Sequence, residues 1–243
     1  MQGDIQAELQ DVWVYLSASP LLHLTLTLAA YQAGMWIYRR GNMNPLLNPV
    51  LIAVVVLVAI LIVTDTSYAT YFEGAQFVHF LLGPATVALA LPLYRQVARV
   101  RKSLLPILIS VIFGSIVATG SALAIAWLFD VSEATLISIA PKSVTTPVAM
   151  GISEKLGGLP SLTAVFVILT GIMGAMIGPL VLNILRIKDW SARGFGIGVA
   201  AHGIGTARAM QVSEVAGAFS GLAMGLNALA TAILLPLLWK LLF

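Results

Sequence analysis

The sequence predicts an all-α polytopic membrane protein with about seven to eight transmembrane segments, two or three of them discontinuous or re-entrant, and with a weak internal repeat. Hydrophobic residues make up 59% of the chain and charged residues only 9%, whereas a soluble domain carries about 25% charged residues. A length of 243 residues accommodates about eight spans of roughly 20 residues joined by short loops. We therefore expect residues 1–243 to form a single transmembrane domain.

Charge and cysteine content exclude several classes of function. Thirteen Lys and Arg against ten Asp and Glu leave a net charge of +3, which does not favour binding to nucleic acid. The chain has no cysteine, so disulfides, thiolate nucleophiles and cysteine-bound metals are absent. Residues 1–11 contain Asp4, Glu8 and Asp11 but no Lys or Arg, unlike the start of a signal peptide. We therefore expect the protein to lie in the lipid bilayer. We also expect the first apolar segment to remain in the mature protein rather than to be cleaved as a signal peptide.

Apolar stretches between polar residues predict the helices in order. Three are apolar on every side, as in helices that face lipid: 49–63, 107–129 and 161–185. Three others contain Gly or Pro together with polar groups near their centres, which predicts interrupted helices: 74–96, 133–156 and 193–212. The complete set of predicted helices is 12–38, 45–64, 74–96, 104–129, 133–156, 160–185, 193–212 and 215–242.

Basic residues in short loops predict the orientation of the helices. Arg39 and Arg40, and the basic cluster at 95–102, indicate cytoplasmic loops, which leaves the N-terminus outside. Lys155 and the cluster at 186–193 both favour the inside, although one helix separates them. If 133–156 spans the membrane, Lys155 is inside and the second cluster outside. If it is a re-entrant hairpin, the second cluster is inside, and the sequence leaves both alternatives open.

The segment Pro141 to Pro147 is the first candidate binding site. Its two prolines disfavour continuous helix and free backbone groups that lipid cannot hydrate. Lys142 adds a cation whose burial costs about 2.5–3.5 kcal/mol, and the helix that starts near Pro147 directs its positive end to the same place. These features favour an anion site, with hydroxyls from Ser143, Thr145 and Thr146. The alternative is a kinked structural helix with Lys142 reaching an interface.

The segment 201–208 is the second candidate. Glycines there and at 194–198 permit close approach of the backbone to a ligand, and the Arg208 guanidinium matches a carboxylate. His202 titrates near neutral pH, which suggests proton coupling. The alternatives are that Arg208 pairs with Glu214 and that His202 is a hydrogen-bonded packing residue. The candidate residues of this segment are His202, Gly203, Gly205, Thr206 and Arg208.

Other motifs are less specific. Asn48 precedes Pro49 and either caps the second helix or faces a central cavity as a substrate ligand. A short similarity between the segments that begin at Pro84 and at Pro141 hints at a repeat, as in transporters with paired broken helices. GxxxG patterns at 217–225 and 174–178 indicate close helix packing, within the chain or in a homodimer. No metal or cofactor is expected, and no catalytic grouping indicates an enzyme.

Four runs together resemble the LrgB/CidB family of bacterial inner-membrane proteins: NPLLNPVL at 44–51, YFEGAQFVHFLLGPATVALALPLYRQ at 71–96, PKSVTTPVAM at 141–150 and AAHGIGTARAMQ at 200–211. The resemblance covers nearly the whole chain and implies a multi-pass protein of the bacterial inner membrane. For some members it implies antiholin- or holin-like control of murein hydrolase activity and lysis, with a small LrgA/CidA-type membrane subunit. For others it implies transport, as in the related plastidial glycolate/glycerate translocator and in pairs associated with pyruvate uptake.

The residues favour the transport version of this resemblance. A hole in the membrane needs no lysine-bearing break, whereas a carboxylate site needs cations, hydroxyls and free backbone ends. We therefore expect a secondary transporter of small 2-hydroxy or 2-oxo monocarboxylates of the glycolate, glycerate, pyruvate or lactate class, coupled to protons through His202. The antiholin-like function with a small partner remains the alternative.

Overall fold

The computed structural model describes residues 20–81, 84, 87–88 and 90–242, and all regular elements in these residues are helices. The helices form two compact units, Met1–Ala88 and Leu89–Phe243. The expectation of an all-α polytopic chain is confirmed. Within the described residues, four helical stretches are long and apolar enough to cross a membrane: Pro45–Val63, Leu104–Leu128, Pro160–Ile184 and Glu214–Lys240.

The first unit consists of α2 (Pro20–Arg40), a short 3₁₀ turn (Pro45–Leu47), α3 (Pro49–Val63) and α4 (Tyr68–Phe80), with α2 packed against both α3 and α4. Asn48 begins α3, because its side-chain oxygen accepts from the amides of Val50 and Leu51 at 2.9 and 3.2 Å. Gly34 allows α2 to pass close to the start of α3, since a Cβ at this glycine would lie 2.6 Å from the Pro49 carbonyl oxygen.

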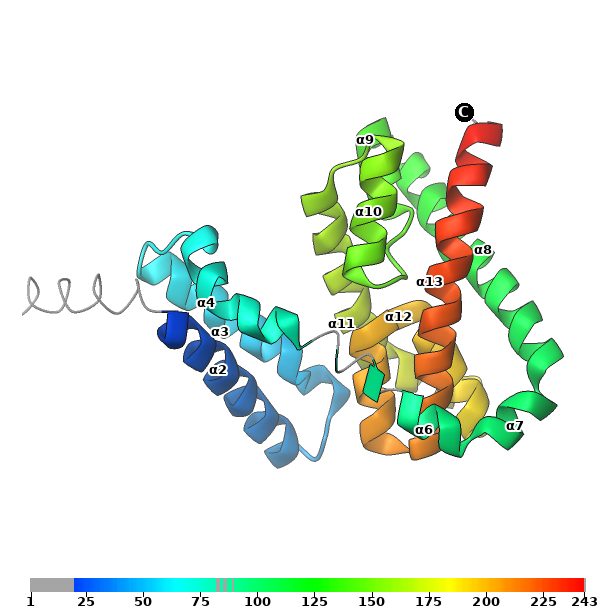
Figure 1. Ribbon diagram of the computed structural model, residues 1–243, viewed down its shortest axis with the longest axis horizontal. Helices are drawn as coiled ribbons and strands as arrows, with labels where there is room; N and C mark the ends of the chain where they lie inside the picture. The colour runs from blue at the N-terminus through cyan, green and yellow to red at the C-terminus, as the bar shows by residue number, and fades with distance from the viewer. Residues whose placement is uncertain (1–19, 82–83, 85–86, 89, 243) are drawn as a thin grey trace, which may run out of the picture. The chain divides into compact units, whose positions relative to one another are not determined.

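The second unit holds all the other helices (Figure 1). Two short helices precede the long α8, and the remaining five follow it in the order α9, α10, α11, α12 and α13. Their bounds are α6 (Ala90–Arg95), α7 (Val97–Lys102), α8 (Leu104–Leu128), α9 (Glu133–Ile139), α10 (Thr146–Leu156), α11 (Pro160–Ile184), α12 (Trp190–Val212) and α13 (Glu214–Leu242).

α9 and α10 form a hairpin rather than one spanning helix. Ser132 caps α9, and the chain leaves the helix before Pro141 and resumes it at Thr146. The end of α10 then returns to α9: the amide of Leu159 donates to Ser138 Oγ at 2.8 Å, and a Cβ on Gly158 would lie 2.7 Å from the Ile137 side chain. Residues 133 and 157 therefore lie at the same end of the unit, which we call the Gly158 end. The re-entrant alternative for 133–156 is the correct one.

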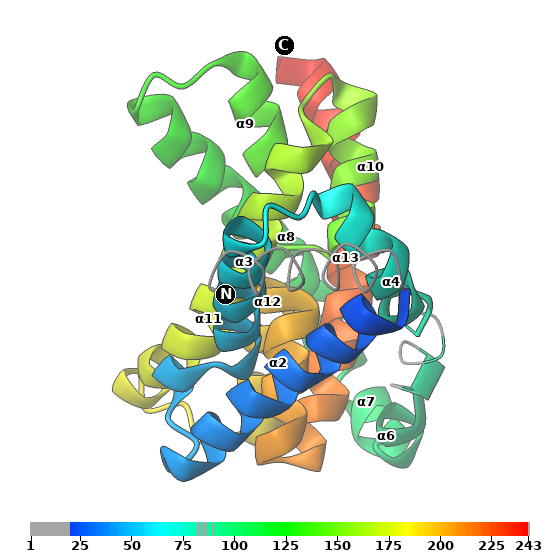
Figure 2. The same ribbon diagram turned by 90° about the vertical axis from the view of Figure 1, so that its left-hand side faces the viewer.

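Apolar packing holds this first hairpin beside the C-terminal half of α13, where both views show it (Figure 1, Figure 2). Ile137 and Ala140 of the hairpin form a buried cluster with Leu235 and Trp239 of α13. α10 ends at Gly157, whose φ of 90° is a left-handed conformation that glycine adopts without steric cost.

α12 is a second hairpin, because its helix is broken at His202, which has φ 39° and ψ −134°. The first half runs beside the start of α13, where Gly194 and Gly198 lie against the backbone of Ala216 and Ser220. The second half returns along the same stretch of α13: Thr206 Oγ1 lies 2.9 Å from Ser220 Oγ, and Gly217 lies against Met210. Residues 190 and 212 thus share one end of the unit, which we call the Asp189 end.

The two hairpins enter the second unit from opposite ends. α8 begins at the Asp189 end, because Ser103 lines the same cavity as Asp189 and Ser191, and it runs to the Gly158 end, where α9 begins. α11 returns from there to the Asp189 end, and α13 then runs from that end to the C-terminus. The basic residues of 95–102 and of 186–193 consequently lie at the same end, away from Lys155, and the conflict between Lys155 and the 186–193 cluster disappears.

Several predicted boundaries need correction. The helix expected to begin at 74 begins at Tyr68 and stops at Phe80, because the turn after Asp65, whose φ is 51°, already ends before it. The helix expected from 193 begins at Trp190, since Asp189 Oδ1 accepts from the Ala192 amide at 2.9 Å and caps it. The predicted start at residue 12 lies outside the described residues, as do residues 85, 86 and 89 of the segment on which the repeat was based.

The glycine patterns on the spans pack largely within the chain. A Cβ on Gly174 would lie 2.5 Å from the Ala201 side chain, and one on Gly178 would meet Ile197, so this face of α11 holds the first half of α12. Gly217 serves the same purpose between α13 and Met210. Gly225 has open space around its Cβ position and is available to lipid or to another chain.

Candidate functional site

The tips of the two hairpins meet at Asn227, in the middle of α13. The Asn227 amide nitrogen donates to the carbonyl of Ser143 on the first tip and to that of Val199 beside the second, both at 3.2 Å. This side chain is only 1% exposed. One asparagine therefore holds both helix breaks that the sequence predicts, although they lie about 60 residues apart in the chain.

The first tip is a tight turn with one cation. The amide of Val144 donates to the carbonyl of Pro141, and Ser143 and Val144 are buried. The Lys142 ammonium donates to Ser143 Oγ at 3.3 Å. Thr145 is the N-terminal cap of α10 but makes no side-chain capping bond, so the first amides of α10 are open toward the tip. Thr146 begins the helix, and both threonines are half-buried.

Lys142 lies in the wall of two neighbouring cavities of about 440 and 390 Å³. The larger runs along α11 past Phe166, Thr170 and Gly174, and the smaller is lined by α8, α9 and Phe166. A lysine side chain in this position has room for a ligand of a few heavy atoms beside its ammonium group.

The second tip is His202, which is 4% exposed. Its Nε2 lies 2.9 Å from the carbonyl oxygen of Val167 on α11. Because a carbonyl can only accept, Nε2 carries the proton, and Nδ1 of the neutral ring is an acceptor. Gly171 makes room for the ring, since a Cβ there would lie 2.6 Å from His202 Cε1. His202 is thus a buried, hydrogen-bonded residue of the packed interior. This is what one of the two interpretations of the sequence expected.

The residues after His202 build the return of the hairpin. Gly205 is tightly enclosed, because its Cβ would lie 2.6 Å from the Ala201 side chain and 2.8 Å from that of Ile197. Thr206 is buried, and its hydroxyl donates to the His202 carbonyl at 2.8 Å. Gly203 is less restricted, with only Met224 near its Cβ position.

The two hairpins bring positive potential to the same place. α10 starts at the first tip and the second half of α12 starts at the second tip, so both direct their N-terminal, positive ends inward. Lys142 adds its positive charge at the first tip. The sequence has no Asp or Glu in 134–153 or in 190–213 to neutralise this charge. The arrangement suits a small anion.

Two other predicted residues have different surroundings. Arg208 is half-buried on the returning half of α12, and Glu214, which the sequence offered as its partner, forms an exposed ion pair with Arg95 at 3.5 Å. Asn48 belongs to the first unit, where it caps α3, whereas all the other candidates belong to the second unit.

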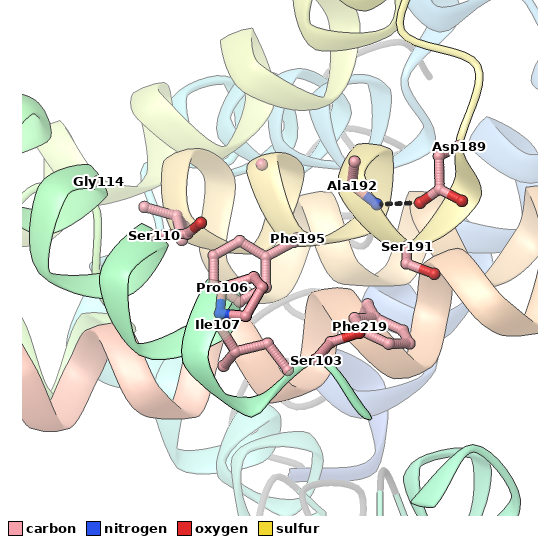
Figure 3. A pocket seen from close by; sticks show the side chains of 12 residues that line it. Ser103, Pro106, Ile107, Ser110, Gly114, Asp189, Ser191, Ala192, Phe195 and Phe219 are labelled. Carbon is pink, nitrogen blue, oxygen red and sulfur yellow. Dashed lines mark hydrogen bonds between the residues drawn. The ribbon is translucent and has the colours of Figure 1, made fainter. Parts of the chain in front are cut away.

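A further cavity, of about 530 Å³, lies between α8, α12 and α13 at the Asp189 end. Figure 3 shows Pro106, Ile107 and Ser110 of α8 facing Phe195 of α12, with Ser191 at the start of α12. Polar residues line the outer part, and Gly114 and Val199 line the inner part. Since the Val199 carbonyl is bound by Asn227, this cavity extends toward the meeting point of the tips.

Sequence reasoning missed Asn227, Ser220 and the Val167 carbonyl. The signal for Asn227 was an uncharged polar residue in the apolar run of 215–242, which is rare in lipid and functional when buried. The glycines of the same helix gave a more obvious pattern, and the carbonyl of Val167 leaves no trace in a sequence.

These features define an all-helical multi-pass membrane protein with two opposed hairpins. The chain belongs to the LrgB-like family, whose model matches residues 27–241. It is 40% identical to the Bacillus subtilis protein YxaC over 89% of this chain and 94% of the relative. It is 34% identical to "Holin-like protein CidB" of Staphylococcus epidermidis, over 92% and 96% of the two chains, and 30% identical to that of Staphylococcus aureus, over 90% and 95%. No solved structure matches.

The family establishes the general class. The protein is a multi-pass bacterial membrane protein of the holin/antiholin-like family, as its sequence resemblance implied. Both segments that carry most of that resemblance, 141–150 and 200–211, include the hairpin tips.

Proposed function

We propose that this protein is a secondary transporter of small 2-hydroxy or 2-oxo monocarboxylates. The observation that carries the proposal is the meeting of two oppositely directed hairpins, each with a half-helix N-terminus at its tip, beside Lys142. Broken helices with these ends near mid-membrane are a recurrent way for transporters to bind an anion.

The residues at the two tips bind different parts of the substrate. The carboxylate lies at the open amides of α10 and beside Lys142, whose charge offsets that of the substrate. Ser143, Thr145 and Thr146 supply hydroxyls to the substrate's other oxygen. The second tip contributes His202 and the backbone of Gly203 and Gly205, while Thr206 fixes the turn through its bond to the His202 carbonyl. Arg208, one and a half turns farther along, attracts the anion on its way to the site.

Alternating access follows from the positions of the cavities. The cavity of about 530 Å³ approaches the tips from the Asp189 end, and the smaller cavity at Lys142, lined by the last turns of α8 and by α9, lies toward the Gly158 end. A shift of one hairpin relative to the other exchanges these routes. The excess of Arg and Lys at the Asp189 end makes that end cytoplasmic by the positive-inside rule. Proton coupling is assigned to Nδ1 of His202, the ring nitrogen that is free to take up a proton.

The test is uptake of labelled glycolate, glycerate, pyruvate and lactate into liposomes that contain only this protein, with and without a pH gradient. We expect saturable uptake of at least one acid. Lys142→Met should reduce it at least about tenfold, since a buried charge partner for an ion is worth about 1.5–3 kcal/mol. Lys155→Met, a matched change at an exposed lysine on α10, should leave uptake unchanged. Full uptake by Lys142→Met would refute the assignment.

A holin-like function is the second candidate, and the names of the CidB relatives support it. In this version the chain oligomerises, with itself or with a small LrgA/CidA-type subunit, and opens a wide lesion. The open face at Gly225 is the surface within the described residues that we assign to such contacts. Release of an encapsulated dye several times larger than lactate distinguishes the two: a carrier retains the dye, and a hole releases it. If the protein forms a hole, Gly225→Leu should abolish dye release; if it is a carrier, this variant should leave acid uptake intact.

A further inference from the structure

The orientation of the Asn227 amide is fixed by its neighbours. One end of the amide faces two backbone carbonyls, those of Ser143 and Val199. A carbonyl oxygen accepts hydrogen bonds and cannot donate them, so this end must be the NH₂ group. The other end is therefore the oxygen, Oδ1.

Oδ1 of Asn227 is a buried acceptor with no hydrogen-bond partner among the residues that the structure describes. Nearby hydroxyls are already engaged: Thr231, one turn along α13, bonds to Ser115 at 2.9 Å, and Ser220 bonds to Thr206. Buried polar atoms in native proteins are nearly always paired, and an exception marks a place for a ligand or water. The side chain that joins both hairpin tips therefore presents an acceptor that a ligand with a hydrogen-bond donor can satisfy.

The surroundings specify the rest of that ligand. Ser143 precedes the start of α10 by three residues, so Asn227, which binds its carbonyl, lies close to the open helix amides and to Lys142. A ligand that fills this place carries a negative group for the helix end and a donor for Oδ1. In a 2-hydroxy acid these two groups are on adjacent carbon atoms.

We infer that Asn227 Oδ1 accepts the hydroxyl of a bound 2-hydroxy acid, and that the protein consequently selects 2-hydroxy acids over 2-oxo acids of the same length. The inference rests on the proposed transport function and narrows its substrate class. A 2-oxo acid presents an acceptor to Oδ1, which is itself an acceptor. The oxo oxygen and Oδ1 are then both left without a hydrogen-bond donor. Sites built to bond a hydroxyl discriminate strongly against analogues that lack it, because their own polar atoms are left unsatisfied.

The direct test compares lactate with pyruvate on the purified full-length protein. Pyruvate is the better oxo acid for this purpose, because glyoxylate is largely hydrated in water and then carries hydroxyls itself. We expect lactate to compete with labelled glycolate at a concentration at least about tenfold lower than pyruvate requires. Propionate, which has neither a hydroxyl nor an oxo group at carbon 2, should compete no better than pyruvate. Equal competition by lactate and pyruvate, with uptake intact, overturns the inference and leaves the transport function standing. Absence of uptake for every acid overturns both.

A pair of variants locates the discrimination. Asn227→Leu preserves the size of the side chain and removes its acceptor and donors, so the preference for lactate over pyruvate should fall from about tenfold or more toward one. Thr231→Val is the control: it removes a different buried polar group, a hydroxyl, from the same helix but outside the site. This variant should keep the preference of the unmodified protein. An undiminished preference in Asn227→Leu refutes the assignment. Should this variant fail to fold, the comparison of lactate with pyruvate on the unmodified protein decides the question.

Discussion

Gly171 controls the position of the second hairpin tip, and Gly171→Ala tests the packing there. The added methyl would lie 2.6 Å from Cε1 and 2.7 Å from Nε2 of His202, and 2.9 Å from the Ile204 side chain. The ring has no space to move away, because it is 4% exposed and bonded to the Val167 carbonyl at 2.9 Å. Relief of the clash therefore breaks this hydrogen bond and shifts the tip.

The expected loss of stability follows from three contributions. Forcing a methyl group into a packed interior costs about 1–3 kcal/mol. Leaving the buried Nε2–H of His202 without its acceptor costs about 1–3 kcal/mol more. Replacing a glycine inside a helix with alanine returns about 0.5–1 kcal/mol. Gly171→Ala should thus lower the free energy of unfolding by about 3 kcal/mol.

Unfolding of the purified protein in mixed micelles, titrated with sodium dodecyl sulfate, measures this loss. Gly120→Ala is the matched control, because a Cβ on that glycine of α8 meets nothing within 4 Å, and its stability should be unchanged or slightly higher. Adding His202→Ala to Gly171→Ala should recover part of the loss, since it removes the ring that the methyl strikes. If Gly171→Ala unfolds at the same detergent fraction as the unmodified protein, the described packing of the tip is wrong.

Two further predictions concern topology and capping. Because the chain has no cysteine, single substitutions Glu133→Cys, Lys155→Cys and Lys188→Cys report sidedness with a membrane-impermeant thiol reagent. The first two should react from the same side of the membrane and the third from the opposite side, whereas a spanning 133–156 segment would separate the first two. Asn48→Ala should lower the free energy of unfolding by about 1 kcal/mol through loss of the α3 cap, measured by the same detergent titration, and no loss would contradict the capping role.

The sequence was sufficient for the long helices and insufficient for the hairpins. The predicted spans 104–129 and 160–185 match α8 and α11 to within one residue, because a continuous apolar run in lipid has only the helix available to it. The segment 133–156 was ambiguous, since its length suits a span as well as a hairpin. The contact of Gly158 with Ile137 decides between them, and it depends on three-dimensional packing that no local pattern encodes.

The candidate site was predicted in the same uneven way. Lys142 and Ser143 stand on the first tip and His202 on the second, as the prolines and glycines suggested. The break falls on His202 itself, although the neighbouring Gly203 accepts a positive φ at less cost. Asn227, which joins the tips, is 84 residues from Ser143 and 28 from Val199, and a pairing over such separations follows from the fold alone.

The close fit of α12 against α13 determines which parts of the second unit can slide. With Gly194 and Gly198 seated against the α13 backbone and Thr206 bonded to Ser220, we expect the second hairpin and α13 to move together. Asn227 belongs to α13, so its bond to Val199 should be kept when the first hairpin is displaced. In the transport cycle that we propose, the bond to Ser143 is therefore the one that opens when the first hairpin moves.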